Sequence, residues 1–209
     1  IRGIVEWRSR SEGVGGVLDD RFHMLMPNKY LEERIFSSIL SEEEMADNAS
    51  PELASIRRKI RGASLRAREQ LDKMIRSPYY QKYLQDPIVT MRSGRFVVPV
   101  KAECRGEVPG LVHDTSSSGA TVFVEPLAVV EANNEIRVLL SREKAEIDRI
   151  LAELSGEAGS FASAVISSYT MAVQLNLIFA KANLGYKMKA TIPLVNDEGI
   201  IDLKKARHP

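Results

Sequence analysis

Apolar residues recur three or four positions apart along two long stretches of the chain, which is the spacing of a helix with one buried face. Ser50, Pro51 and Glu52 precede the first stretch and favour a helix start, because serine caps free amides and proline fits the first turn. Ser77 and Pro78 end it, since proline disfavours the helical conformation of the residue before it. The predicted seam of this helix consists of Leu53, Ile56, Ile60, Ala63, Ala67, Leu71 and Met74.

The second long stretch runs from Leu127 to Leu154, and we expect Gly156 and Gly159 to interrupt it. Its predicted seam consists of Ile136, Leu140, Ile147, Leu151 and Leu154. Beyond the glycines, heptad spacing predicts a third helix with the seam Phe161, Val165, Ser168, Ala172, Leu175, Phe179, Ala182 and Tyr186. A helix of about 28 residues measures about 42 Å, so these elements are suited to act as levers or struts.

The segment between the first two helices changes to β-forming and turn residues. Ser93 and Gly94 separate two strand-like runs, and glycine can take the positive φ that a two-residue hairpin turn requires. A second hairpin is predicted around the sequence "TSSSG", which gives a small antiparallel sheet of about four strands. Pro99 cannot donate a ladder hydrogen bond, so we expect its strand to lie at an edge or to bend.

These elements predict a mainly α fold, in which long lever helices and a helical core carry a small antiparallel β clamp inserted between the helices. Little order is expected through Phe22, and Ile200, Ile201 and Leu203 resemble a strand that enters another domain. The predicted organisation is a connector (1–29), helical core with the first lever helix (30–87), β clamp (88–125), return lever helices and core (126–190) and the start of a following domain (191–209).

Composition narrows the class of protein. The chain has 209 residues, 44% of them hydrophobic, and a formal net charge of +1. Its single cysteine, Cys104, cannot form an internal disulfide, so we expect a cytoplasmic location. The three histidines share no ligand spacing, and no run of about 18 apolar residues occurs, so neither a metal site nor a membrane span is expected.

Basic residues are unevenly distributed along the chain. The predicted clamp carries the first candidate nucleic-acid contacts, Arg92, Arg95, Lys101 and Arg105. Acidic residues at positions 103, 107 and 114 dilute this charge. The first long helix carries a second candidate basic face, Arg57, Arg58, Arg61 and Arg68. For that helix, a solvated face balanced by the acidic residues 42–44 is the simpler interpretation on charge alone.

The serine-rich loop beside His113 and Asp114 invites a catalytic interpretation. A phosphate-binding loop needs a lysine and a following helix, whereas this loop has no lysine and runs into a strand. The sequence also lacks a Gly-x-Ser-x-Gly nucleophile elbow. We therefore interpret the loop as a hairpin tip held by side-chain to backbone hydrogen bonds, and we assign no catalytic residue.

Five stretches together resemble the bacterial MutS type II family: "ASPELASIRRKIR", "IVTMRSGRFVVPVKAE", "PGLVHDTSSSGATVFVEP", "NNEIRVLLSREKAEIDRILAELS" and the terminal "ARHP". The resemblance extends from Leu31 to Pro209. It implies a helical core, lever helices and a clamp. In the family an ATPase domain follows the "ARHP" region and a Smr nuclease domain usually follows that. The resemblance therefore implies that residues 191–209 are the start of the ATPase domain. We therefore expect no enzyme activity and no cofactor in this piece, with ATP and Mg²⁺ used by the full-length parent.

The resemblance also implies a function. Family members act as homodimers on branched DNA and are linked to suppression of homologous recombination, while some act on collided ribosomes. Nucleic-acid binding by the clamp is the preferred interpretation, with branched DNA as the partner. Two alternatives remain open: a ribosome- or rRNA-contacting module, and a purely structural lever that dimerises through the seam between Phe161 and Tyr186. The choice of clamp residues rests on their charge and position.

Overall fold

The computed structural model describes residues 1–10 and 15–204, so the terminal "ARHP" motif lies outside the described residues. The chain divides into two compact units. One is Glu33–Ser155, and the other combines Ile1–Glu32 with Gly156–Pro209. The mainly α fold with a small antiparallel sheet between helical segments is confirmed.

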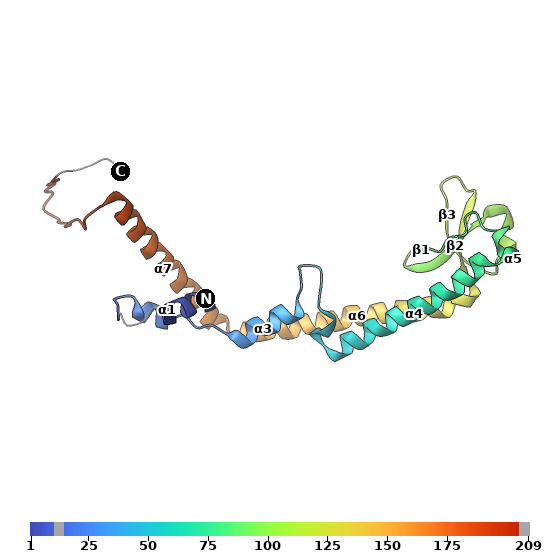
Figure 1. Ribbon diagram of the computed structural model, residues 1–209, viewed down its shortest axis with the longest axis horizontal. Coiled ribbons are helices and arrows are strands. Elements are labelled where there is room, and N and C mark those ends of the chain that lie inside the picture. The colour runs from blue at the N-terminus through green and yellow to red at the C-terminus, as the bar shows by residue number, and fades with distance from the viewer. Residues whose placement is uncertain (11–14, 205–209) are drawn as a thin grey trace. The chain divides into compact units, whose positions relative to one another are not determined.

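The unit formed by residues 33–155 is built on two long helices, α4 (Pro51–Arg76) and α6 (Leu127–Ser160). Figure 1 shows them side by side. They run antiparallel, because Arg57 near the start of α4 bonds to Glu143, whereas Arg66 further along bonds to Glu135. At about 1.5 Å per residue they measure about 39 and 51 Å. We call this helix pair the arm. It is preceded by α3 (Lys29–Ser38) and the 3₁₀ helix η1 (Asp47–Ala49).

The predicted seam of α4 faces the core: Leu53, Ile56, Ala63, Ala67 and Leu71 are buried, and the other two members, Ile60 and Met74, are half-buried. The predicted seam of α6 is only partly right. Ile136 and Leu154 are buried, but Leu140 and Leu151 are 46% and 40% exposed. Their neighbours Leu139 and Ile150 are buried instead. One neighbouring helix covers a narrow stripe, and a shift of one residue turns a side chain by about 100° around the helix. Nor do the glycines interrupt α6, which continues through both to Ser160.

Ser50 caps the start of α4 as predicted. Its Oγ accepts a hydrogen bond from the Leu53 amide (2.9 Å) and donates one to Glu146 on α6 (2.7 Å). The Arg149 guanidinium, together with the Ser50 hydroxyl, lowers the pKa of Glu146 from its ordinary value of 4.5 to about 2. The same hydroxyl therefore begins one helix and ties it to the other.

Replacing Ser50 by alanine is expected to lower the free energy of unfolding by about 1 to 2 kcal/mol, because the α4 cap and the bond to Glu146 are both lost. Urea denaturation followed by circular dichroism measures this loss. Ser77→Ala is the matched control, since Ser77 stands before α5 without a side-chain capping bond. Equal losses in the two variants would contradict the capping role.

A four-stranded antiparallel sheet follows α5 (Pro78–Gln81), as predicted. Its strands are β1 (Thr90–Arg92), β2 (Arg95–Lys101), β3 (Gly110–Thr115) and β4 (Thr121–Pro126), in the order β1-β2-β4-β3. Ser93 and Gly94 both have positive φ (50° and 73°), the conformation of the hairpin turn that suits twisted strands. The 3₁₀ helix η2 (Ala102–Glu107) links β2 to β3. We call residues 78–126 the tip.

The edge-strand expectation for Pro99 is wrong, because β2 lies inside the sheet between β1 and β4. The structure explains why proline is tolerated there. The pairing of β1 with β2 ends at Val97, and the Pro99 carbonyl accepts from the Gln85 amide. The nitrogen and carbonyl of one strand residue point to the same side. The missing N–H of Pro99 therefore faces a short loop, and no ladder bond to β4 is lost.

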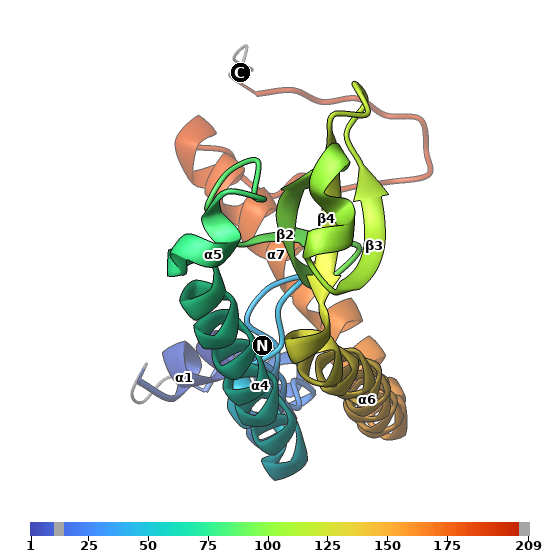
Figure 2. The same cartoon turned by 90° about the vertical axis from the view of Figure 1, so that its right-hand side faces the viewer.

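The tip is joined to the arm by a shared apolar core. Val98, Val100 and Val124 of the sheet pack with Leu71 near the end of α4 and Val129 at the start of α6. Figure 2 looks at this end of the unit, with the sheet and α5 placed where α4 ends and α6 begins. The sheet is thus fixed to both helices through side chains that are almost completely buried.

The second unit contains α1 (Arg2–Arg10), α2 (Asp19–His23) and α7 (Ala162–Met188). The expectation of little order through Phe22 is wrong for the described residues of this segment, because they form the helices α1 and α2. Phe22 and Leu25 are buried against Met171 and Leu175 of α7. The α1 and α2 segments are too short to show helical periodicity in the sequence. They obtain their order from the apolar surface of α7, which is distant in sequence.

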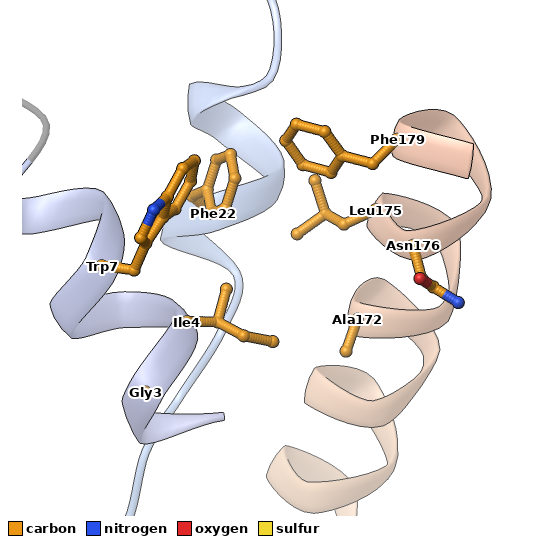
Figure 3. A pocket seen from close by; sticks show the side chains of 8 residues that line it. All are labelled: Gly3, Ile4, Trp7, Phe22, Ala172, Leu175, Asn176 and Phe179. Atoms are coloured by element: carbon orange, nitrogen blue, oxygen red, sulfur yellow. The ribbon is translucent and has the colours of Figure 1, made fainter. Parts of the chain in front are cut away.

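An open apolar pocket of about 390 Å³ lies among these three helices (Figure 3). The rings of Trp7, Phe22 and Phe179 lie beside one another in tilted and edge-to-face arrangements, with centroids 6.2 to 6.5 Å apart. Ser168 is buried, and its hydroxyl accepts from the Met26 amide at 2.9 Å. Part of the seam predicted for dimerisation is thus in contact with residues of its own chain.

By length and composition α7 could cross a membrane, with a mean hydropathy of 1.3 over its most apolar window. Only 17% of that window is buried within this structure, and one helix that meets these two criteria is weak evidence for a membrane span. Beyond α7, residues 190–204 form neither helix nor strand, so the strand expected around Ile200, Ile201 and Leu203 is absent from this described stretch.

Candidate nucleic-acid interface

A buried carboxylate lies at the centre of the tip. Glu125 at the end of β4 is 0% exposed. Arg95 Nη1 donates to both of its oxygens (2.7 and 3.0 Å), Asn133 Nδ2 donates to Oε1 (2.7 Å), and the His113 ring contacts Oε2. Asn133 also exchanges two hydrogen bonds of 3.1 Å with the backbone of Phe96. Glu125 therefore connects three strands of the sheet to helix α6.

Arg95 is one of the four predicted clamp contacts, and its guanidinium is engaged inside the protein. Its side chain is only 14% exposed, and Nη2 donates to Asn134 of α6 at 2.8 Å. Charge satisfied by a buried carboxylate is not available to a phosphate group. In this structure Arg95 therefore holds the tip together.

Arg92 is partly engaged as well. Its guanidinium lies 4.0 Å from the centroid of the Phe123 ring and forms an ion pair of 3.3 Å with Asp114. Both contacts are at the surface, where such interactions are individually weak. A phosphate could compete for this arginine at modest cost.

Lys101 and Arg105 lie together at the end of β2 and in η2. Lys101 Nζ donates to the Lys82 carbonyl at 3.1 Å, a bond that leaves its positive charge uncompensated. Arg105 is exposed, and within the described ranges neither residue forms an ion pair. The four predicted residues thus divide into one buried anchor, one weakly paired cation and two available cations.

The second candidate basic face, on α4, also divides. Arg57 bonds to Glu143 and Asp47 (both 2.6 Å), and Arg61 shares Asp47 at 3.1 Å. Arg58 and Arg68 are exposed and form no ion pair with any residue that the structure describes. The acidic partners are Asp47 and Glu143, and not the residues 42–44 expected to balance this helix.

Sequence reasoning missed a surface on α5. Tyr79 is exposed beside Lys82, and its ring contacts those of Tyr80 and Tyr83. The available signal was the run "YYQKYL", in which aromatic residues and a lysine follow a helix-ending Ser-Pro. Aromatic residues interleaved with basic ones are typical of nucleic-acid surfaces.

The serine-rich hairpin is held by local bonds. Ser116 Oγ accepts from the Thr121 amide (3.1 Å) and lies 3.3 Å from Ser118 Oγ. His113 contacts Glu125, so its ring is engaged on the buried side of the sheet. Among residues 1–10 and 15–204 no group of three His, Cys, Asp or Glu side chains is arranged to hold a metal ion.

Two antiparallel helices carry a small β tip, which agrees with the architecture that the resemblance to the MutS type II family implies. No protein-family model matches the chain. The chain is 51% identical to Endonuclease MutS2 of Acetivibrio thermocellus over 193 aligned residues. These residues are 92% of this chain and 24% of that protein. It is 48% identical over 198 residues to Endonuclease MutS2 of Ruminiclostridium cellulolyticum, covering 95% and 25%.

A third relative, Endonuclease MutS2 of Pelotomaculum thermopropionicum, is 52% identical over 179 residues, which are 86% of this chain and 23% of that protein. The chain belongs to the bacterial MutS type II family, as the resemblance predicted. It spans about a quarter of the length of the curated relatives it matches. Those relatives are named endonucleases.

Proposed function

We propose that the arm, together with the tip that it carries, binds branched DNA and so serves the suppression of homologous recombination by a full-length protein. The relatives carry a name that implies action on nucleic acid. The link to recombination rests on the family resemblance. The observation that carries the proposal is a set of exposed cations along α4 that form no ion pair with any residue that the structure describes.

The cations of α4 differ in their availability. Arg57, Arg61 and Arg66 are bound to acidic groups of the same unit. The exposed cations that form no ion pair within the described chain are Arg58, Lys59, Arg68, Lys73 and Arg76. Only placed positive charge is needed to hold a phosphate backbone. The free cations therefore supply what the paired ones cannot.

Arg58 and Arg76 lie on the same face of α4. They are separated by eighteen residues, about five turns of helix, or about 27 Å. That distance equals about eight base pairs of duplex at ~3.4 Å each. Lys101 and Arg105 extend the positive charge into the tip. An arm of this kind can follow a DNA strand without reading its sequence.

A pair of matched double variants tests this function. Arg58→Gln/Arg76→Gln removes two free cations, whereas Arg61→Gln/Arg66→Gln removes two paired ones from the same helix and changes the net charge equally. Fluorescence anisotropy measures binding of this chain to a labelled four-way junction, a linear duplex and a structured ribosomal RNA hairpin at several salt concentrations. We expect the first variant to bind the junction roughly tenfold more weakly, with a salt slope shallower by about 2.

The control variant should change the slope much less. Equal losses in both variants would mean that only net charge matters, and absence of binding by the unaltered chain would reject the proposal. A preference for the RNA hairpin over both DNAs would replace branched DNA by the ribosomal alternative. Arg95 is unsuitable for this test, because its replacement leaves Glu125 buried without its main partner.

A further inference from the structure

The tip presents a group of aromatic rings and a cation that the arm proposal does not use. Tyr79, Tyr80 and Tyr83 lie within five residues on and beside α5. The Tyr79 ring meets those of Tyr80 and Tyr83 edge to face, with centroids 5.0 and 5.6 Å apart. Lys82 Nζ lies 5.1 Å from the centroid of Tyr79 and 4.6 Å from that of Tyr83.

The three tyrosines differ in their burial and in what they contact. Tyr80 and Tyr83 are partly buried and pack against the core of the sheet, so they fix α5 to the sheet. Tyr79 is 56% exposed and does not belong to that core. Its ring is nevertheless held in one orientation by two neighbouring rings and a lysine. An exposed ring that is already ordered loses little entropy when a ligand stacks on it.

The charges around Tyr79 favour a base over a phosphate as its ligand. Tyr83 raises the pKa of Tyr79, with burial and the negative charge of Glu107 adding to the effect, so the phenol stays neutral at physiological pH. Tyr83 raises the pKa of Lys82, and the negative charge of Glu107 adds to the effect, so an acidic side chain stands beside this lysine as well. Lys101 bonds to the Lys82 carbonyl, and Arg105 belongs to η2, whose Glu107 acts on Tyr79, so these two cations are the candidates to hold the phosphates.

We propose that Tyr79 is a stacking platform for an unpaired base of a branched or partly single-stranded nucleic acid, with Lys101 and Arg105 holding the adjoining phosphates. This inference rests on the proposed function and names the part of the ligand that the tip contacts. Every base has a π face, so the platform selects unpaired over paired nucleotides without selecting a sequence. Paired duplex keeps its bases stacked inside and gives Tyr79 nothing to contact.

The test compares Tyr79→Ala with Tyr79→Phe in the full 209-residue chain. The ligands are a duplex with a six-nucleotide single-stranded flap, as DNA and as RNA, and the same duplex with blunt ends. One flap base is 2-aminopurine, whose fluorescence falls when it stacks. We expect Tyr79→Ala to bind the flap ligand about 5- to 100-fold more weakly and to lose the fluorescence change. Tyr79→Phe keeps the ring and should retain both.

The blunt duplex separates this inference from the arm proposal, because its affinity should be the same for all three proteins. Flap binding and 2-aminopurine quenching that survive Tyr79→Ala would overturn the platform and leave the arm proposal intact. Absence of binding to every ligand by the unaltered chain would overturn both. Loss confined to the DNA flap or to the RNA flap would support the platform and identify the nucleic acid it accepts.

Discussion

Arg95→Ala is expected to lower the free energy of unfolding of the tip by about 3 kcal/mol. The carboxylate of Glu125 is completely buried, and Arg95 is its cationic partner. Removing one partner of a buried pair typically costs about 3 to 5 kcal/mol, because the remaining charge stays desolvated. The lower end applies here, since Asn133 and His113 still contact the carboxylate. Urea denaturation and amide hydrogen exchange in residues 90–126 measure the loss.

Arg92→Ala is the matched control for this prediction. Arg92 pairs with Arg95 across the turn of the same hairpin, so this variant also removes one arginine. The contacts of Arg92 with Asp114 and Phe123, however, lie at the surface. Such contacts are typically worth about 1 kcal/mol or less. If both variants lowered the free energy of unfolding by a similar amount, the buried ion pair between Arg95 and Glu125 would contribute no more than a surface contact.

A second replacement tests the physical cause. If an uncompensated charge destabilises Arg95→Ala, then Glu125→Gln in that background should recover part of the stability, because an amide keeps the shape and carries no charge. No recovery would assign the loss to packing of the arginine stem. Arg95→Ala should also weaken nucleic-acid binding, but only in proportion to unfolding of the tip.

Local signals in the sequence were enough to predict much of this fold. The α4 helix has an amphipathic seam, a serine cap and a terminating Ser-Pro, and all three depend on neighbours within four residues. The two hairpins are equally local, since Ser93 and Gly94 alone determine the first turn. The end of α6 was harder, because two glycines weaken a helix without ending it when the rest of the turn is favourable.

The candidate site was less predictable because charge in a sequence does not reveal pairing. Arg95 and Arg105 cannot be distinguished from the sequence alone. In the structure Arg95 bonds to the carboxylate of Glu125, thirty residues further along the chain, whereas Arg105 is exposed. On α4 the same division depends on Asp47 and Glu143, which approach only once the helices lie side by side. Ion pairing thus removes some predicted contacts and leaves others available. Tyr79 was missed because exposure of an aromatic residue is a tertiary property.

Gly110→Ala is expected to separate β3 from β4 and to lower the free energy of unfolding by about 2 to 3 kcal/mol, in the upper part of the range for overpacking. Gly110 is the first residue of β3 and pairs with Pro126. A Cβ added there would lie 2.8 Å from Val124 Cγ1, 2.9 Å from the Glu125 carbonyl carbon and closer still to the Glu125 carbonyl oxygen. Backbone atoms cannot rotate away as a side chain can, so the strands must move apart.

Gly106→Ala is the control, because nothing lies within 4 Å of the added carbon in η2 and its stability should change by less than about 0.5 kcal/mol. The clash at Gly110 involves the backbone of Glu125, the residue whose carboxylate binds Arg95. Displacing that backbone must also displace the buried carboxylate. Gly110→Ala and Arg95→Ala should therefore cost less together than the sum of their separate losses. Additive losses would show that β3 pairing and the Glu125 network stabilise the tip independently.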